Sequence, residues 1–204
     1  MAVLEIRLFG DPVLTQKSDP VTRFDAELAR FGADLLETLR SAYGVGLAAP
    51  QVGVLKRMFA YDIPPNEETG EHPFGVLVNP VITRWEGEQD GEEGCLSFPG
   101  IYYACKRAMG VTVAAVDLGG QALEVDGEGL LARCIQHEVD HLDGVLFIER
   151  LSRGDRKRAL KQWREREFDL EFEGIAPHLH RSDLTGGPGA SSLGPRGNPP
   201  DKTL

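Results

Sequence analysis

The segment His-Glu-Val-Asp-His at residues 137–141 constrains the fold of this chain more than any other feature. Two histidines four residues apart share one face only if the segment is helical, because an α-helix completes a turn every 3.6 residues. The surrounding pattern predicts that helix over residues 130–142, and Gly144 can end it. His137 and His141 could then bind one metal ion, with Glu138 beside it to act on a metal-bound water.

Two other interpretations of this pattern have to be weighed. Because the chain has five histidines among 204 residues, such a spacing arises by chance in about one per cent of comparable sequences. A solvated surface helix could also carry both histidines without any metal. However, Leu130, Leu131 and Ile135 give the helix an apolar side, which indicates that it is buried and favours a metal site.

A catalytic site of this kind needs a third protein ligand, and the residues leave several candidates. A third histidine of the metzincin pattern is disfavoured, because Phe147 stands at its position. Glu165 is a downstream carboxylate, but its charged neighbours are typical of a solvated helix. Cys134 lies one turn before the first histidine, although a buried cysteine in an apolar helix usually only packs. We favour Cys95, which follows a glycine that permits close approach, but composition alone does not decide the matter.

Composition limits the function classes. The chain has 32 acidic against 22 basic residues and a net charge of -10, which argues against a general nucleic-acid binder. We therefore expect no specific nucleic-acid sequence as a partner. No apolar run approaches the ~18 residues of a membrane span, and the N-terminal residues do not form a signal peptide. Three cysteines without Cys-x-x-Cys spacing fit a reducing compartment. We therefore expect a cytoplasmic protein with no membrane partner.

Helical and strand patterns are interspersed without the regular order of a parallel-sheet protein, which favours an α+β fold. Helices are expected over residues 25–43, 130–142 and 153–168. Strands are expected over residues 57–61, 76–79 and 81–85, and as a hairpin of 111–116 with 122–125. We expect one catalytic domain, residues 1–172, with antiparallel sheets packed around a central metal-binding helix. Residues 173–204 end in a Gly- and Pro-rich stretch and are expected to form a disordered tail.

Three motifs resemble those of the peptide deformylase family. They are Gly-Val-Gly-Leu-Ala-Ala-Pro-Gln at 44–51, Glu-Gly-Cys-Leu-Ser at 93–97 and Gln-His-Glu-Val-Asp-His at 136–141. All three are complete and follow the family's order, and the resemblance extends over residues 3–151. It implies a metallohydrolase that removes the formyl group from the N-terminal formylmethionine of newly synthesised proteins and releases formate.

The resemblance also implies roles for individual residues. The metal ligands would be Cys95, His137 and His141. Glu138 would act as the general acid and base, and the Gln51 side chain with the backbone N–H of Leu96 would stabilise the oxyanion. The family's usual ion is Fe²⁺, and Zn²⁺, Ni²⁺ or Co²⁺ can replace it.

Substrate contacts are expected around an apolar pocket for an unbranched methionine side chain. The candidates are Val45, Gly46, Glu93, Gly94, Leu130 and Cys134. Three of them, Val45, Leu130 and Cys134, are expected to form the pocket wall, although they could simply be core residues. The small Gly46 could let the peptide backbone pair with this segment as an added strand.

Partners follow from the same resemblance. It implies N-formylmethionyl nascent peptides as substrates and a C-terminal helix that docks on the ribosome. Seven basic residues lie between positions 153 and 166. Acidic residues are interleaved with them, so an ordinary solvated helix is an equally good interpretation.

Two other functions remain in competition. A zincin-type endopeptidase would cleave internal peptide bonds and would keep its metal after Cys95→Ser. In a non-catalytic module the metal would only stabilise the fold, and Glu138→Ala would change nothing else.

Overall fold

The structure of the chain is a computed structural model that describes residues 2–172, so the expected tail at 173–204 lies outside the described residues. The α-helices are α1 (Ala26–Ser41), α2 (Gly129–Leu142) and α3 (Arg153–Phe172). Three short 3-10 helices are η1 (Pro12–Thr15), η2 (Ala49–Val52) and η3 (Phe147–Glu149). The strands are β1 (Gly46–Ala48), β2 (Met58–Asp62), β3 (Phe74–Glu86), β4 (Gln89–Cys95), β5 (Phe98–Arg107), β6 (Gly110–Val116) and β7 (Ala122–Glu128).

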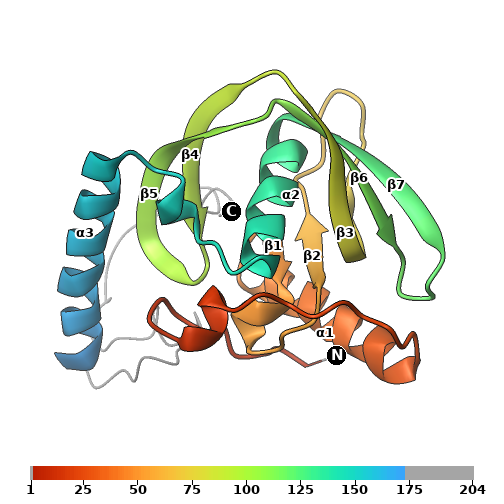
Figure 1. Cartoon of the computed structure of the whole chain (residues 1–204), viewed down its shortest axis with the longest axis horizontal. Coiled ribbons are helices and arrows are strands. Elements are labelled where there is room, and N and C mark those ends of the chain that lie inside the picture. The colour runs from red at the N-terminus through yellow and green to blue at the C-terminus, as the bar shows by residue number, and fades with distance from the viewer. Residues whose placement is uncertain (1, 173–204) are drawn as a thin grey trace, which may run out of the picture.

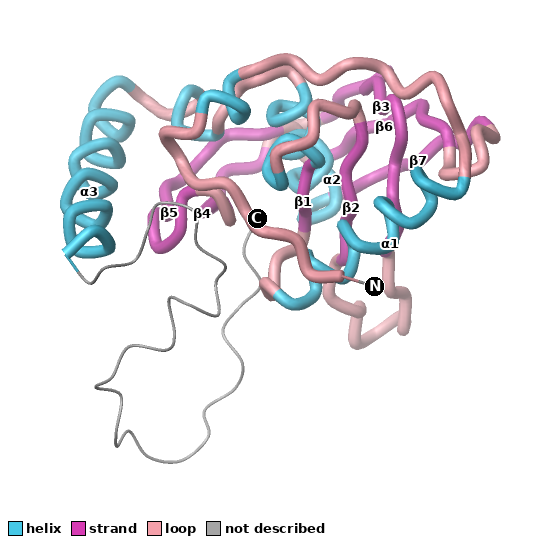
Figure 2. Tube along the Cα trace, turned by 90° about the horizontal axis from the view of Figure 1, so that it is seen from below, coloured by secondary structure: helices cyan, strands magenta, loops and turns pink. Residues whose placement is uncertain are grey.

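The strands form two antiparallel sheets with α2 between them. The larger sheet has the order β1-β2-β3-β6-β7, and the smaller consists of β4 and β5 alone. Figure 1 shows α2 at the centre of the molecule, the hairpin β4–β5 on one side and the larger sheet on the other. Viewed from below, α3 covers the outer side of the hairpin and α1 lies beneath the larger sheet (Figure 2). The expected α+β fold with a central helix is confirmed.

Local sequence rules explain α1 and the strands beside it. The Asp25 carboxylate accepts hydrogen bonds from the N–H groups of Glu27 and Leu28, which caps the start of α1. Leu28, Leu35 and Leu39 recur at helical spacing and are buried against the sheet. Helix α1 and strand β2 both contact the short strand β1, and Gly46 of β1 lies against the Glu138 side chain.

The two strands expected at 76–79 and 81–85 are one long strand, β3, with an irregular register between Val78 and Val81. Asn79 has a φ of 52°, and Pro80 lacks the N–H that a regular ladder requires. The Asn79 side chain instead exchanges two hydrogen bonds of 2.8 Å with the Val21 backbone. The bulge therefore ties the N-terminal segment to the sheet.

The hairpin β4–β5 was not expected from the sequence. Its first strand reads Gln-Asp-Gly-Glu-Glu-Gly-Cys, a composition with low strand propensity. Pairing with β5 nevertheless places Cys95 at the tip of the hairpin, opposite Phe98. No helix among the residues described is both long and apolar enough to cross a membrane.

Candidate metal centre

Four buried side chains of α2 share one face, because they are spaced three and four residues apart. Cys134, His137, Glu138 and His141 are all buried, at 0 to 1% exposure. The helix begins after the paired strand β7 and is followed by Gly144, whose φ is 74°. A side chain at Gly144 would lie 2.7 Å from the Thr15 carbonyl oxygen, so only glycine fits this helix end. The helix thereby brings two imidazoles and a carboxylate into the interior.

Three possible metal-binding atoms converge below this face. The His137 and His141 Nε2 atoms are 3.2 Å apart, and the Cys95 Sγ lies 3.2 Å from His141 Nε2. All three ligand atoms lie within 4.8 Å of one another, and all three residues are buried. Among the candidate third ligands, the structure brings Cys95 to the histidines.

The other candidate ligands lie elsewhere. The Cys134 thiol donates to the Val45 carbonyl at 3.3 Å. Phe147 stacks against the His137 ring and has no ligand atom. Glu165 is exposed on α3, where it pairs with Lys161.

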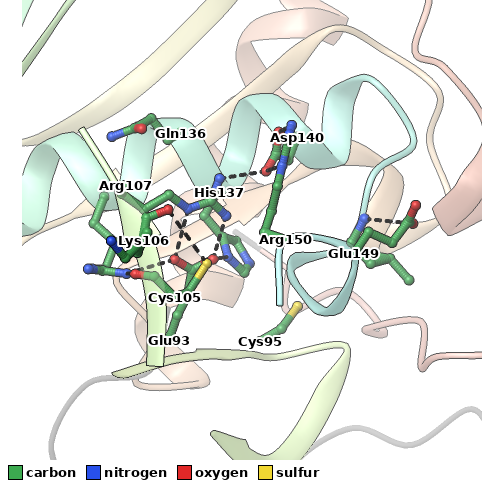
Figure 3. Close-up of polar contacts among 12 residues, drawn as sticks. Glu93, Cys95, Cys105, Lys106, Arg107, Gln136, His137, Asp140, Glu149 and Arg150 are labelled. Atoms are coloured by element: carbon green, nitrogen blue, oxygen red, sulfur yellow. Dashed lines mark hydrogen bonds and ion pairs between the residues drawn. The ribbon is translucent and has the colours of Figure 1, made fainter. Parts of the chain in front are cut away.

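Glu93 fixes the orientation of His137. Its carboxylate accepts from His137 Nδ1 at 2.7 Å, which leaves Nε2 free as a metal ligand. Glu93 also accepts from Arg107 at 2.6 and 3.0 Å and from Arg133 at 3.0 Å. Burial alone would raise the pKa of Glu93, but the bonds from His137 and Arg107 hold it well below its usual range. Figure 3 shows Glu93 and Arg107 on the same side of α2 as His137.

The network surrounds Glu93, which is also one of the residues expected to contact substrate. The carboxylate is 1% exposed, and its oxygens are already occupied by three basic side chains. This arrangement fits a carboxylate that orients the His137 ring, and the expected substrate contact of Glu93 stays a prediction.

Sequence reasoning did not identify Arg107 or Arg133, which complete the network. Arg107 also donates to Asp140 on α2 at 2.6 Å, and Arg133 donates to the Cys105 carbonyl at 2.8 Å. The only available signal was that Arg133 interrupts the apolar stripe of α2. A buried cation on such a stripe requires an anionic partner.

Glu138 follows His137 on α2, and both that histidine and the Ala48 backbone N–H oppose the effect of burial on its pKa. It is 0% exposed, and neither of its oxygens has a hydrogen-bond partner among the described residues. Burial raises the pKa of Glu138 to about 7, although the nearby His137 opposes the shift. A side chain at Gly46 would lie 2.3 Å from a Glu138 oxygen, so β1 crosses directly over this carboxylate. A carboxyl group with such a pKa can both accept and release a proton near neutral pH.

Gln51 lies beside Cys95. Its Oε1 accepts from the Ala48 N–H at 2.8 Å, which fixes the amide orientation. Its Nε2 then faces Cys95 Sγ at 3.5 Å and Ser97 Oγ at 3.2 Å. Leu96 follows Cys95 directly and is 7% exposed, with its side chain in the core.

Only some of the residues expected to contact substrate lie together in the structure. Val45, Gly46 and Cys134 lie together beside Glu138, and both Val45 and Cys134 are fully buried. Leu130 is 42% exposed on the first turn of α2, so it is not a core residue. Gly94 packs closely under a ring: a side chain there would lie 2.6 Å from Tyr102.

The donor set fits a metal ion. One thiolate and two imidazoles are ligands that Zn²⁺ and Fe²⁺ accept, and a catalytic site keeps a position open for water.

The surroundings shift the pKa values of the two histidines in opposite directions. Burial lowers the pKa of His141 well below its usual value. Burial also opposes protonation of His137, but Cys95 and Glu93 raise its pKa.

Comparisons with known proteins agree with this geometry. Residues 3–157 match the family model described as polypeptide deformylase. A peptide deformylase of Acidothermus cellulolyticus is 51% identical over 168 residues, which cover 82% of this chain and 89% of that protein. The peptide deformylase of Parafrankia sp. is 47% identical over 182 residues, covering 87% and 96%. The crystal structure of a peptide deformylase from Thermus thermophilus superimposes with a TM-score of 0.74 at 43% identity, covering 84% and 99%.

Proposed function

The chain belongs to the polypeptide deformylase family, metal-dependent enzymes that remove the formyl group from N-formylmethionyl nascent peptides, and we propose that its Cys95, His137 and His141 hold the catalytic ion. One observation carries this proposal. Three ligand atoms within 4.8 Å of one another lie beside a buried carboxylate that has no hydrogen-bond partner among the described residues. A buried unpaired carboxylate destabilises a fold, and a role in proton transfer gives a reason for keeping it.

When bound, the ion would lower the pKa of a coordinated water and polarise the formyl oxygen. We propose Fe²⁺ as the native ion, with Zn²⁺, Ni²⁺ or Co²⁺ as substitutes. The mixed nitrogen and sulfur donor set supports this group of borderline cations over Mg²⁺ or Ca²⁺. Glu93 supports ion binding by fixing the His137 tautomer.

Glu138 would move the protons of the reaction. It takes a proton from the water that attacks the formyl carbon, and it delivers that proton to the departing nitrogen. The C–N bond breaks, and the products are formate and a peptide with a free N-terminus. A carboxyl pKa of about 7 suits both transfers, since neither protonation state is strongly disfavoured near neutral pH.

Gln51 and the backbone N–H of Leu96 would stabilise the charge that develops on the formyl oxygen. The Ala48 N–H holds the Gln51 amide in place, so its NH₂ group needs little reorganisation. A donor of this kind contributes about 3–4 kcal/mol to a transition state.

The substrate would enter with its methionine side chain toward Val45 and Cys134, with Leu130 at the rim. Buried apolar and thiol surfaces accept an unbranched thioether well. The backbone of Gly46 would pair with the peptide as an added strand, because its lack of a side chain lets the peptide approach Glu138.

The ribosome is proposed as a docking partner in the cytoplasm. Exposed basic residues of α3, among them Arg156, Lys157 and Arg158, would face ribosomal RNA. Reversing these three residues to Glu should abolish co-sedimentation with ribosomes, while Arg84→Glu, at an exposed site on β3, should not. Unchanged co-sedimentation of the triple variant would overturn the docking proposal.

The activity itself is tested with formyl-Met-Ala-Ser and protein prepared without oxygen. The wild-type chain should release formate, and Glu138→Ala should lose this activity while it retains metal. Cleavage of casein by the wild type would instead indicate an endopeptidase. Absence of formate release from fully metal-loaded protein would overturn the proposal.

A further inference from the structure

The hairpin that contains Cys95 gains little stability from strand pairing, because it consists of only two strands. Strands β4 and β5 pair only with each other in the described part of the chain. An isolated two-stranded hairpin is marginally stable in water, so contacts outside the sheet must fix its tip. Because Cys95 sits at that tip while His137 sits on α2, these contacts also set the distance between the two ligands.

Aromatic packing provides those contacts on the side of α3. Phe98, the cross-strand partner of Cys95, stacks on Trp163 of α3 with ring centroids 4.8 Å apart and an interplanar angle of 21°. The Phe9 ring meets Phe98 edge-on at 4.7 Å, and the Phe9 N–H donates to the Ser97 carbonyl at 2.7 Å. Phe98 and Trp163 are each 3% exposed. The tip is thus held between the N-terminal segment and α3.

The same packing reaches the second ligand through η3. Phe147 meets Phe98 edge-on at 6.0 Å and stacks on the His137 ring at 6.2 Å with an interplanar angle of 29°. Cys95, Phe98, Phe147 and Trp163 belong to one buried cluster. Two ligands from different elements are therefore joined through two phenylalanine rings to one indole.

Trp163 is the main anchor of α3. Among the side chains described on this helix, only Ala159 and Trp163 are buried. Tyr103 of β5 adds one hydrogen bond, from its hydroxyl to Gln162 at 3.0 Å. Figure 1 shows α3 lying along β5. The Trp163 indole stacks on Phe98 of that strand.

We propose that Trp163 is a positioning residue for the metal centre. Through Phe98 and Phe147 it holds Cys95 and His137 at the spacing that binds the ion. Close-packed interiors relax only partly when a large side chain is removed, so loss of the indole lets Phe98 and the hairpin tip shift. This inference rests on the proposed function, since it takes Cys95 and His137 as ligands.

The test uses the full chain loaded with Co²⁺, whose absorption bands report on thiolate and imidazole ligation. Three variants are compared with the wild type: Trp163→Ala, Trp163→Phe and Trp85→Ala. Trp85 is a matched control because it is 60% exposed on β3, in the other sheet. The measurements are the rate of Co²⁺ release to a chelator and the cobalt–thiolate absorption band.

Trp163→Ala should release Co²⁺ about tenfold faster and show a weaker thiolate band, as is typical when the support of a ligand is lost. Trp163→Phe keeps a ring in the stack and should restore both readouts, and Trp85→Ala should match the wild type. A merely structural Trp163 would lower the unfolding temperature without changing the band of the folded protein.

Equal release rates and equal bands for Trp163→Ala and Trp85→Ala would overturn the proposal. If Trp163→Ala does not fold, Trp163→Leu is measured in the same way, and wild-type values for it would overturn the proposal as well. Failure of the wild type to bind Co²⁺ would instead refute the proposed metal site, so the two failures are distinguishable.

Discussion

Replacing Glu138 with Gln should stabilise the metal-free protein, and increasingly so as the pH rises. The carboxylate is fully buried, and neither oxygen has a hydrogen-bond partner among the described residues. Its pKa is about 7 in the folded chain, against 4.5 for an ordinary glutamate. Between these values the unfolded chain has lost the proton while the folded chain retains it, so the free energy of unfolding falls as the pH rises.

The size of the effect follows from that difference in pKa. The rise from 4.5 to about 7 corresponds to about 3 kcal/mol at a pH above both values. At pH 5 most of this penalty is absent, and about 1 kcal/mol remains. Glutamine has nearly the same shape and no charge, so Glu138→Gln should escape the penalty at every pH.

Urea unfolding at pH 5, 7 and 9, after removal of metal by a chelator, measures this difference directly. Glu92→Gln is the matched control because Glu92 is exposed on the same hairpin strand as Cys95. Its effect on the free energy of unfolding should stay within about 0.5 kcal/mol at all three pH values. A pH-independent difference between Glu138→Gln and the wild type, or a variant less stable at pH 9, would refute the reasoning.

Three further perturbations test other parts of the site. Cys95→Ala should lose bound metal in elemental analysis of anaerobically prepared protein, and stoichiometric metal in this variant would contradict its role as a ligand. Glu93→Gln should lower the free energy of urea unfolding by about 3–5 kcal/mol, because it leaves Arg107 buried without its full anionic partner. A loss below about 1 kcal/mol would show that the network contributes little to stability. Gly46→Ala should lower formate release and destabilise the chain by about 1–3 kcal/mol, since the added carbon meets a Glu138 oxygen at 2.3 Å. Gly154→Ala on α3, where the added carbon makes only an ordinary contact of 3.8 Å with Ser152 Oγ, should not destabilise the chain. Normal formate release by Gly46→Ala would show that β1 can move away from the carboxylate.

Local patterns predicted the helices well. Apolar residues at helical spacing, a capping Asp25 and a terminal Gly144 located α1 and α2 within a few residues of their observed ends. The hairpin β6–β7 was also recognised, because strand propensity and the glycine turn agree there. These features depend on neighbours along the chain.

Long-range pairing was harder to predict. The acidic, glycine-rich strand β4 is held by its partner β5 and by the basic side chains that neutralise Glu93. Neither contact leaves a local signature in the sequence, so local patterns predict neither the hairpin nor the basic partners of Glu93. The bulge at Asn79 was missed for the same reason, since its side chain bonds the distant Val21 backbone.

Local sequence is enough to place the two histidines and the carboxylate together, because a helix sets the geometry of residues three and four apart whatever surrounds it. Which distant side chain joins them depends on how the separate elements pack in three dimensions. The distance from Cys95 to His141 depends on how a two-stranded hairpin packs against a helix, through Glu93 on one side and the ring of Phe98 on the other. Packing between elements brings distant residues together, and no periodicity within the chain encodes that separation.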